Sequence, residues 1–122
     1  MDMQNTSAAS TYDKTGHVLL LMLQEVGRAV TVPYVALRLN IAHEEVVQIL
    51  SSFVTHQLVN TEVVEGQLKP GAKRAIRERL YRFTADGACQ ARALLRARRL
   101  VVAFANYARS HKLNLDVLDA SD

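Results

Sequence analysis

The sequence predicts a mainly α-helical domain of the α+β class, in which a small β-hairpin separates two groups of helices. Apolar residues recur at helical spacing between residues 14 and 57. From Leu58 the pattern changes to β-branched and roughly alternating, and it stops at Gly66. Residues 85–110 are rich in Ala, Leu and Arg, which are strong helix formers. A length of 122 residues fits a single domain.

The first and third helices are expected from their apolar stripes. The first covers residues 14–26 and meets a stop at Gly27. The third covers residues 43–57, with a wide apolar stripe on one side. Glu44 and Glu45 fall in its first turn, where the helix dipole favours acidic side chains.

The second helix is short, and its boundaries are predicted by its end residues. It is expected over residues 33–39, with Thr31 as the capping residue and Pro33 in the first turn. Asn40 is expected to end it, because asparagine tolerates a left-handed backbone.

Two strands and a long helix complete the expected order. The first strand runs from Leu58 to Glu65, Pro70 and Gly71 predict a turn, and the second strand runs from Ile76 to about Thr84. The expected organisation is a flexible start, a core domain, a long helix, and a frayed tail or short addition, over residues 1–12, 13–84, 85–110 and 111–122.

Charge is distributed unevenly along the chain. Ten of the fifteen basic residues lie between Lys69 and Arg99, and that stretch has a net charge of +8. Residues 1–66 have a net charge of −4, and residues 100–122 a net charge of −1. A positive field confined to one third of a small domain favours binding to a polyanion such as nucleic acid. The alternative is a long helix whose arginines are simply solvated.

The cysteine count and the absence of targeting signals point to the cytoplasm. Cys89 is the one cysteine, so an internal disulfide is excluded. The longest apolar stretch, Val18–Leu23, is far shorter than the roughly 20 residues of a membrane span. The first eleven residues are polar and lack the pattern of a secretion signal.

The order helix, short helix, longer helix and hairpin resembles the DNA-binding core of bacterial winged helix-turn-helix transcription regulators, closest to the MarR and PadR families. Residues 46–59, VVQILSSFVTHQLV, are similar to the recognition helix and its exit in these families. Residues 79–87, RLYRFTADG, are similar to the return strand of the wing and the turn into the next helix. The resemblance covers residues 16–96.

The resemblance implies a regulator, expected to be a repressor, that binds double-stranded DNA. Its recognition helix would enter the major groove, and its wing would neutralise phosphates or enter the minor groove. The candidate recognition-helix residues are His43, Gln48, Ser51, Ser52 and Thr55. The candidate wing residues are Lys69, Lys73, Arg74, Arg77, Arg79 and Arg82, the last two of which are expected to follow the DNA backbone along the return strand.

The sequence departs from the family pattern at two places. The expected recognition helix has no Lys or Arg, and its two early glutamates would repel phosphates. Gln57 also stands where these families have a glycine at the exit of that helix. A winged helix used for protein contact within a larger assembly, without specific DNA readout, is therefore the alternative function.

The helix expected over residues 85–110 is longer than a small core can cover. In the resembling families such a helix pairs with its twin, so a homodimer is expected, with Leu94, Leu95, Val101 and Phe104 as candidate contact residues. The alternative is that it folds back over the N-terminal helix of the same chain. Arg92, Arg96 and Arg99 share one face, where they would either extend the basic surface or keep the dimer soluble.

Enzymatic and metal-binding functions are not expected. No glycine-rich phosphate loop, serine elbow or catalytic carboxylate pair is present. No zinc-site spacing links the four histidines, which are His17, His43, His56 and His111. Cys89 is interpreted as a small residue facing the core, with an oxidant-sensitive thiol as the alternative. No cofactor is expected, and nothing in the sequence identifies a small-molecule effector.

Overall fold

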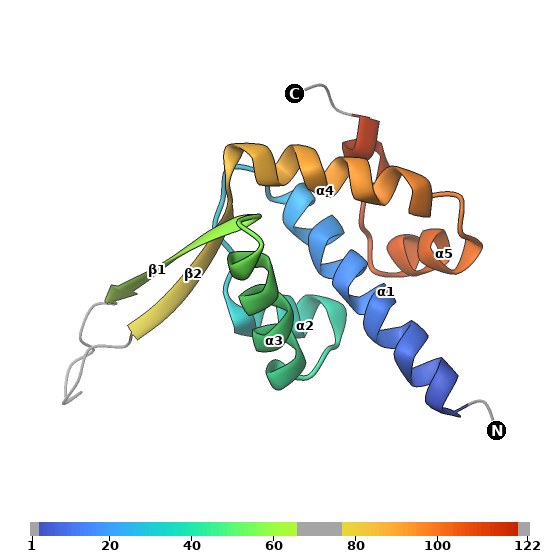
Figure 1. The fold of residues 1–122 in the computed structure, drawn as a ribbon, viewed down its shortest axis with the longest axis horizontal. Coiled ribbons are helices and arrows are strands. Elements are labelled where there is room, and N and C mark those ends of the chain that lie inside the picture. The colour runs from blue at the N-terminus through green and yellow to red at the C-terminus, as the bar shows by residue number, and fades with distance from the viewer. Residues whose placement is uncertain (1–2, 66–76, 120–122) are drawn as a thin grey trace.

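The structure, a computed structural model, describes residues 3–65 and 77–119, with the backbone alone for residues 3–13 (Figure 1). The elements are α1 (Met3–Gln24), α2 (Val32–Leu39), α3 (His43–Thr55), β1 (Val59–Glu65), β2 (Arg77–Phe83), α4 (Ala85–Arg98), α5 (Val102–Ser110) and a 3-10 helix, η1 (Leu115–Asp119). The predicted α+β class, with helices around one antiparallel hairpin, is confirmed.

Helix α1 runs through the middle of the molecule. Helix α4 lies across one end of it, α5 folds back beside it, and α2 and α3 pack between α1 and the hairpin (Figure 1). The segment Val18–Leu23 is buried on every side, because neighbouring helices cover its whole circumference. The start of α3 and the far end of the hairpin both point away from α4 (Figure 1).

The predicted boundary signals of α2 are confirmed. The Thr31 side chain accepts a hydrogen bond from the backbone N–H of Tyr34 at 3.3 Å, and Pro33 lies in the first turn. Asn40 ends the helix with a left-handed φ of 54°. Together these ends fix the tight angle at which α2 leads into α3.

The hairpin is regular and is attached to the core at its base. Its register runs from the pair Val59–Phe83 to the pair Glu65–Arg77. Val30, in the α1–α2 connection, adds an antiparallel bridge to Tyr81, with backbone hydrogen bonds of 2.8 and 2.9 Å. The buried side chains of Val59 and Tyr81 therefore anchor the base of the hairpin, and its far end projects from the core.

The two stretches that carried the family resemblance meet in space at the exit of α3. Gln57 adopts a left-handed φ of 63°, so the turn forms without a glycine. The Thr84 hydroxyl donates to the Gln57 carbonyl at 3.1 Å and accepts from the backbone N–H of Gly87 at 2.8 Å. A Cβ atom at Gly87 would overlap the carbonyl oxygen of Leu58, so only glycine allows this approach.

The structure corrects the expected N-terminal boundary. Helix α1 begins at Met3, whereas the first helix was expected to begin near residue 14 after a flexible start over residues 1–12.

The single helix expected over residues 85–110 is also corrected, because it is two helices. Val101 has an extended backbone, with φ −82° and ψ 119°, and it breaks the helix after Arg98. The break turns α5 back so that Phe104 and Ala108 are buried against the core. A straight continuation would have carried these residues away from α1. The fold-back alternative is therefore the one that α5 adopts.

The tail expected over residues 111–122 is a short addition to the core as far as Asp119. Leu113 and Leu118 are buried, and η1 packs on α4. Gln24 and Asn114 exchange two hydrogen bonds of 2.8 and 2.9 Å, which attach the segment to the end of α1.

Candidate nucleic-acid interface

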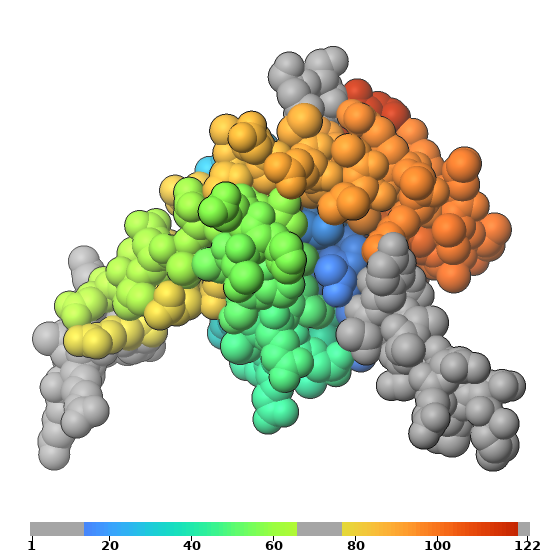
Figure 2. All heavy atoms as spheres, viewed as in Figure 1, coloured from blue at the N-terminus to red at the C-terminus, as the bar shows by residue number. Residues whose placement is uncertain are grey.

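Helix α3 exposes one polar face and buries one apolar face. Its buried residues are Val46, Ile49, Leu50 and Phe53. The five candidate recognition residues are all exposed, namely His43, Gln48, Ser51, Ser52 and Thr55. Figure 2 shows α3, in green, standing outermost on the face of the molecule toward the viewer. The structure therefore brings these candidates together on one accessible surface.

Two further residues on this face were not among the sequence candidates. Glu44 is exposed, and Val47 is 44% exposed although its neighbour Val46 is completely buried. By its apolar character Val47 counts toward the wide apolar stripe predicted for residues 43–57, because the sequence of a short helix does not show where such a stripe ends. The spacing of hydroxyl and amide side chains at positions 48, 51, 52 and 55 would have placed Val47 on the polar side.

The two early glutamates of α3 have different surroundings. The Glu45 carboxylate forms an ion pair of 2.8 Å with the ammonium group of Lys14 on α1, and both side chains are partly buried. Glu44 points to solvent. Because Lys14 compensates one of the two carboxylates, the repulsion expected between α3 and phosphates is smaller than the sequence suggests.

The arginines of the hairpin lie on two opposite faces. Arg77 and Arg79 share a face with the anchored Tyr81, and Arg82 lies on the other face, because successive residues of a strand alternate. The two arginines that are expected to follow the DNA backbone therefore lie on opposite faces of the hairpin. Arg77 pairs with Glu65 at 3.5 Å, and Arg79 donates to the Thr61 hydroxyl at 3.4 Å.

The described strands of the hairpin have no net charge. They contain three arginines, at positions 77, 79 and 82, and three glutamates, at positions 62, 65 and 78. The candidates Lys69, Lys73 and Arg74 lie outside the described residues. The predicted positive character of the wing therefore depends on those three residues of the connecting segment.

Arginines of α4, and Arg99 directly after it, have partners within the chain. Arg96 donates to the Leu118 carbonyl at 2.7 Å, and Arg99 pairs with the Asp119 carboxylate at 2.7 and 2.9 Å. The Arg99 hydrogen bond lowers the pKa of Asp119 below its usual value. Arg92 is buried, and the Arg98 guanidinium lies over Gly16 of α1. These contacts attach the C-terminal segment and α1 to α4, and the Arg96 residue is exposed as well.

The four candidate dimer contacts divide into two pairs. Leu95 and Phe104 are buried in the core of the single chain, which removes them from a contact surface. Leu94 and Val101 are exposed. Leu100 and Val102 are 83% and 72% exposed, although neither was among the predicted dimer contacts. Cys89 is exposed as well, which corrects its interpretation as a core-facing residue.

His17 is a buried titratable residue between α1 and α5. Its ring stacks on Tyr107 with centroids 3.4 Å apart and on Phe104 with centroids 5.4 Å apart. Neither ring nitrogen has a hydrogen-bond partner. Burial, followed by the charges of His111 and Arg98, lowers the pKa of His17 from 6.5 to about 4. The Tyr107 hydroxyl donates to the Leu39 carbonyl at 2.9 Å, which connects this stack to α2.

A hollow opens between α1, α3 and α4, with α1 at its floor (Figure 2). It has a volume of about 380 Å³ and combines an apolar wall with polar groups at its edge. Leu19, Phe53 and Leu95 are among the apolar residues, and Ser52, His56 and Gln90 are among the polar ones.

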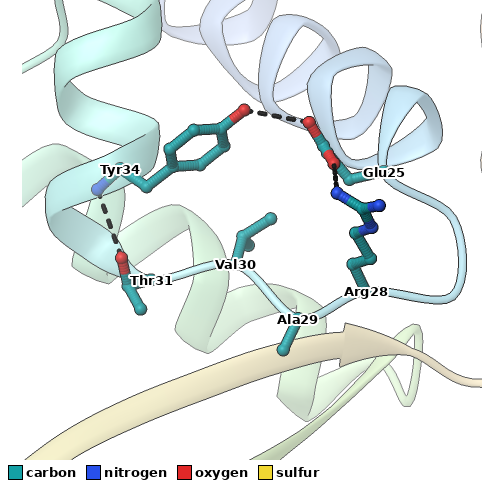
Figure 3. A pocket seen from close by; sticks show the side chains of 6 residues that line it. All are labelled: Glu25, Arg28, Ala29, Val30, Thr31 and Tyr34. Atoms are coloured by element: carbon teal, nitrogen blue, oxygen red, sulfur yellow. Dashed lines mark hydrogen bonds and ion pairs between the residues drawn. The ribbon is translucent and has the colours of Figure 1, made fainter.

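A second hollow, of about 320 Å³, lies at the α1–α2 connection beside β2 (Figure 3). Its polar side chains are already engaged with one another. The Tyr34 hydroxyl donates to Glu25 at 3.0 Å, and Arg28 lies 4.0 Å from the same carboxylate. We interpret these contacts of Glu25 with Tyr34 and Arg28 as structural, because they hold the start of α2 against the end of α1.

The side chains of the described residues contain no group of three His, Cys, Asp or Glu residues that could hold a metal ion. Within the same part of the chain, no helix is both long enough and apolar enough to cross a membrane.

No protein-family model and no curated protein matches this chain. Among solved structures, a doubly substituted variant of Lactococcus lactis ZitR in its apo form is similar, with a TM-score of 0.51 and 13% identity over 89% of this chain and 74% of that chain. A singly substituted ZitR variant has a TM-score of 0.49 and 13% identity over 80% of this chain. The adhesin competence repressor AdcR of Streptococcus pyogenes has a TM-score of 0.44 and 16% identity over 87% of this chain and 70% of that chain.

The chain spans 60% of the length of the singly substituted ZitR variant. At 13% identity, the similarity with a TM-score of 0.51 concerns the fold alone. That fold is the winged helix, in which α2 and α3 form the helix-turn-helix and the hairpin forms the wing.

Proposed function

We propose that this chain is a DNA-binding transcription regulator, expected to be a repressor, that binds duplex DNA as a homodimer. The observation that carries the proposal is the exposed polar face of α3 within a winged-helix fold. Each of its five sequence-predicted side chains is accessible, whereas the apolar side of the same helix is buried. A helix presented in this way fits the major groove, where hydroxyl and amide groups can reach base edges.

Most of the affinity for DNA is expected to come from the contacts of the wing with phosphates. Arg77, Arg79 and Arg82 are exposed on the projecting hairpin, and Lys69, Lys73 and Arg74 belong to its connecting segment. Phosphate neutralisation releases counterions, so binding should weaken steeply as the salt concentration rises. This division of roles leaves α3, which has no cation of its own, to contribute base contacts.

The homodimer would pair at the junction of α4 and α5. Leu94, Leu100, Val101 and Val102 expose apolar surface there, and pairing two copies would remove it from water. Two wings and two α3 helices would then face one near-palindromic site. Sedimentation equilibrium should show two chains per particle for the wild type and one for a Leu100→Glu, Val102→Glu variant. A monomeric wild type would contradict this part of the proposal.

A small-molecule effector, if the regulator takes one, is assigned to the hollow between α1, α3 and α4. Its volume of about 380 Å³ lies within the range of ligand pockets. It adjoins Ser52 and His56 at the end of α3, so a bound molecule would touch the helix that faces DNA.

The alternative function is a protein-interaction module. It is favoured by the absence of Lys and Arg from α3 and by the zero net charge of the described strands. In that case the exposed Glu44 and Val47 would contact a partner protein.

A gel-shift titration with duplex DNA tests the proposed function. At low salt the wild-type chain should shift the duplex, and the shift should disappear as salt is added. On the preferred site, Gln48→Ala should weaken binding and relax the preference at one base pair, whereas on unrelated DNA it should change little. No shift at low salt would contradict the proposal and favour the interaction module.

A further inference from the structure

We infer that α3 reads an A·T-rich half-site in which Val47 contacts the methyl group of a thymine. This inference rests on the proposed function, and it adds the class of DNA sequence and one specificity-determining residue. It is drawn from the chemistry and arrangement of the side chains that α3 presents to solvent.

The exposed face of α3 consists of two adjacent columns of side chains. Residues four apart lie above one another on a helix, so the columns follow from position alone. One column contains His43, Val47, Ser51 and Thr55, and the other contains Glu44, Gln48 and Ser52. Val47 therefore lies between His43 and Ser51 in its column, where the exposed face borders the buried Leu50.

The face has no side chain suited to read guanine with two hydrogen bonds. That contact uses Arg or Lys on O6 and N7 of guanine, and α3 contains neither residue. Gln48 can form the corresponding pair of hydrogen bonds with N6 and N7 of adenine. Glu44 can accept a hydrogen bond from cytosine, but it lies in the first turn, at the end of the face. The centre of the face is therefore suited to A·T pairs.

Val47 supplies the apolar contact that thymine requires. The C5 methyl group of thymine is the apolar feature of the major groove, and apolar side chains recognise it. Single exposed valines are common on protein surfaces and need no explanation by themselves. The position of Val47 is what distinguishes it, because it lies between two exposed polar residues, His43 and Ser51, on the helix assigned to DNA. Val63, which is 49% exposed, lies on the projecting hairpin.

Thymine and uracil differ by this methyl group, which allows a direct test. A preferred site is first selected from a random duplex library with the wild-type chain. Each thymine of that site is then replaced singly by deoxyuridine, and binding is measured for the wild type, Val47→Ala and Val63→Ala. Val63→Ala is the matched control, because it removes the same atoms from an equally exposed valine outside α3.

The selected half-sites should be A·T-rich. At one thymine of each half-site, uracil should weaken wild-type binding about fourfold, the effect of removing one methyl group from an apolar contact. Val47→Ala should bind both bases equally at that position, and Val63→Ala should keep the sensitivity of the wild type to uracil, whatever its overall affinity. Circular dichroism spectra that match the wild type would show that both variants are folded.

Three outcomes would overturn the inference while leaving the proposed function standing. These are half-sites specified by guanine, wild-type binding that uracil weakens at no position, and Val47→Ala binding that remains sensitive to uracil. If the wild-type chain bound no DNA even at low salt, both the proposed function and this inference would fail.

Discussion

Arg77, Arg79 and Arg82 of β2 are exposed on a projecting hairpin, whereas Arg96 of α4 and Arg99, directly after α4, are hydrogen-bonded to the C-terminal segment. In the sequence both groups belong to one basic stretch. In the fold, Arg96 and Arg99 donate hydrogen bonds to backbone carbonyls and to one carboxylate of their own chain. These charge-assisted hydrogen bonds stabilise the fold. The net charge of a segment therefore overestimates the positive charge that a polyanion can contact, because partners within the chain occupy some of its charged side chains.

Among side chains that have their contacts inside the fold, the largest effect on stability is expected for His17. Its pKa is about 4 in the folded chain and 6.5 in the unfolded one. Between these values the unfolded chain binds more protons, so the free energy of unfolding falls as pH falls from 6.5 towards 4. For the wild type, His17 alone should remove about 3 kcal/mol of stability by the lower end of this window.

Urea unfolding across this pH range, for the wild type and for His17→Phe, measures the effect. Phenylalanine keeps an aromatic ring between Phe104 and Tyr107 but cannot take up a proton. The difference in unfolding free energy between the two proteins should change with pH by the amount given above. If the unfolding free energies of the two proteins changed with pH in parallel, His17 would not be held neutral by its surroundings.

A smaller effect is expected for Lys14, which tests how α3 tolerates its acidic first turn. Lys14→Ala leaves the Glu45 carboxylate without its partner at 2.8 Å. Because the freed negative charge would face phosphates, DNA affinity should fall about twofold to threefold at low salt, the scale of a partly exposed ion pair. The double variant Lys14→Ala, Glu45→Gln should recover wild-type affinity in the same titration. Equal affinities of the wild type and Lys14→Ala would show that Glu45 is too far from the DNA to matter.

Local signals in the sequence predicted much of the helix-turn-helix and the hairpin. Thr31, Pro33 and Asn40 specify the ends of α2 through local hydrogen bonds and backbone preferences, which need no knowledge of the rest of the fold. The change to a β-branched alternating pattern at Leu58 similarly located β1.

The region after the hairpin could not be predicted in the same way. No proline or glycine marks the break between α4 and α5. It forms because Phe104 and Ala108 are buried when α5 turns back towards α1. The partners of Arg96 and Arg99 lie about twenty residues further along the chain, so helical spacing alone could not reveal them. At the candidate interface, the same dependence on long-range contacts hid the ion pair between Lys14 and Glu45.

The comparison between the two groups of arginines is tested most directly by the salt dependence of DNA binding. The slope of log affinity against log salt should become shallower by about three per wing, or about six for the dimer, for Lys73→Ala, Arg74→Ala, Arg77→Ala, because each phosphate contact contributes about one. For Arg96→Ala, Arg99→Ala the slope should equal that of the wild type, while the stability to urea falls. An unchanged slope in the wing variant, or an equal loss of slope in the α4 variant, would contradict the assignment of DNA contact to the wing.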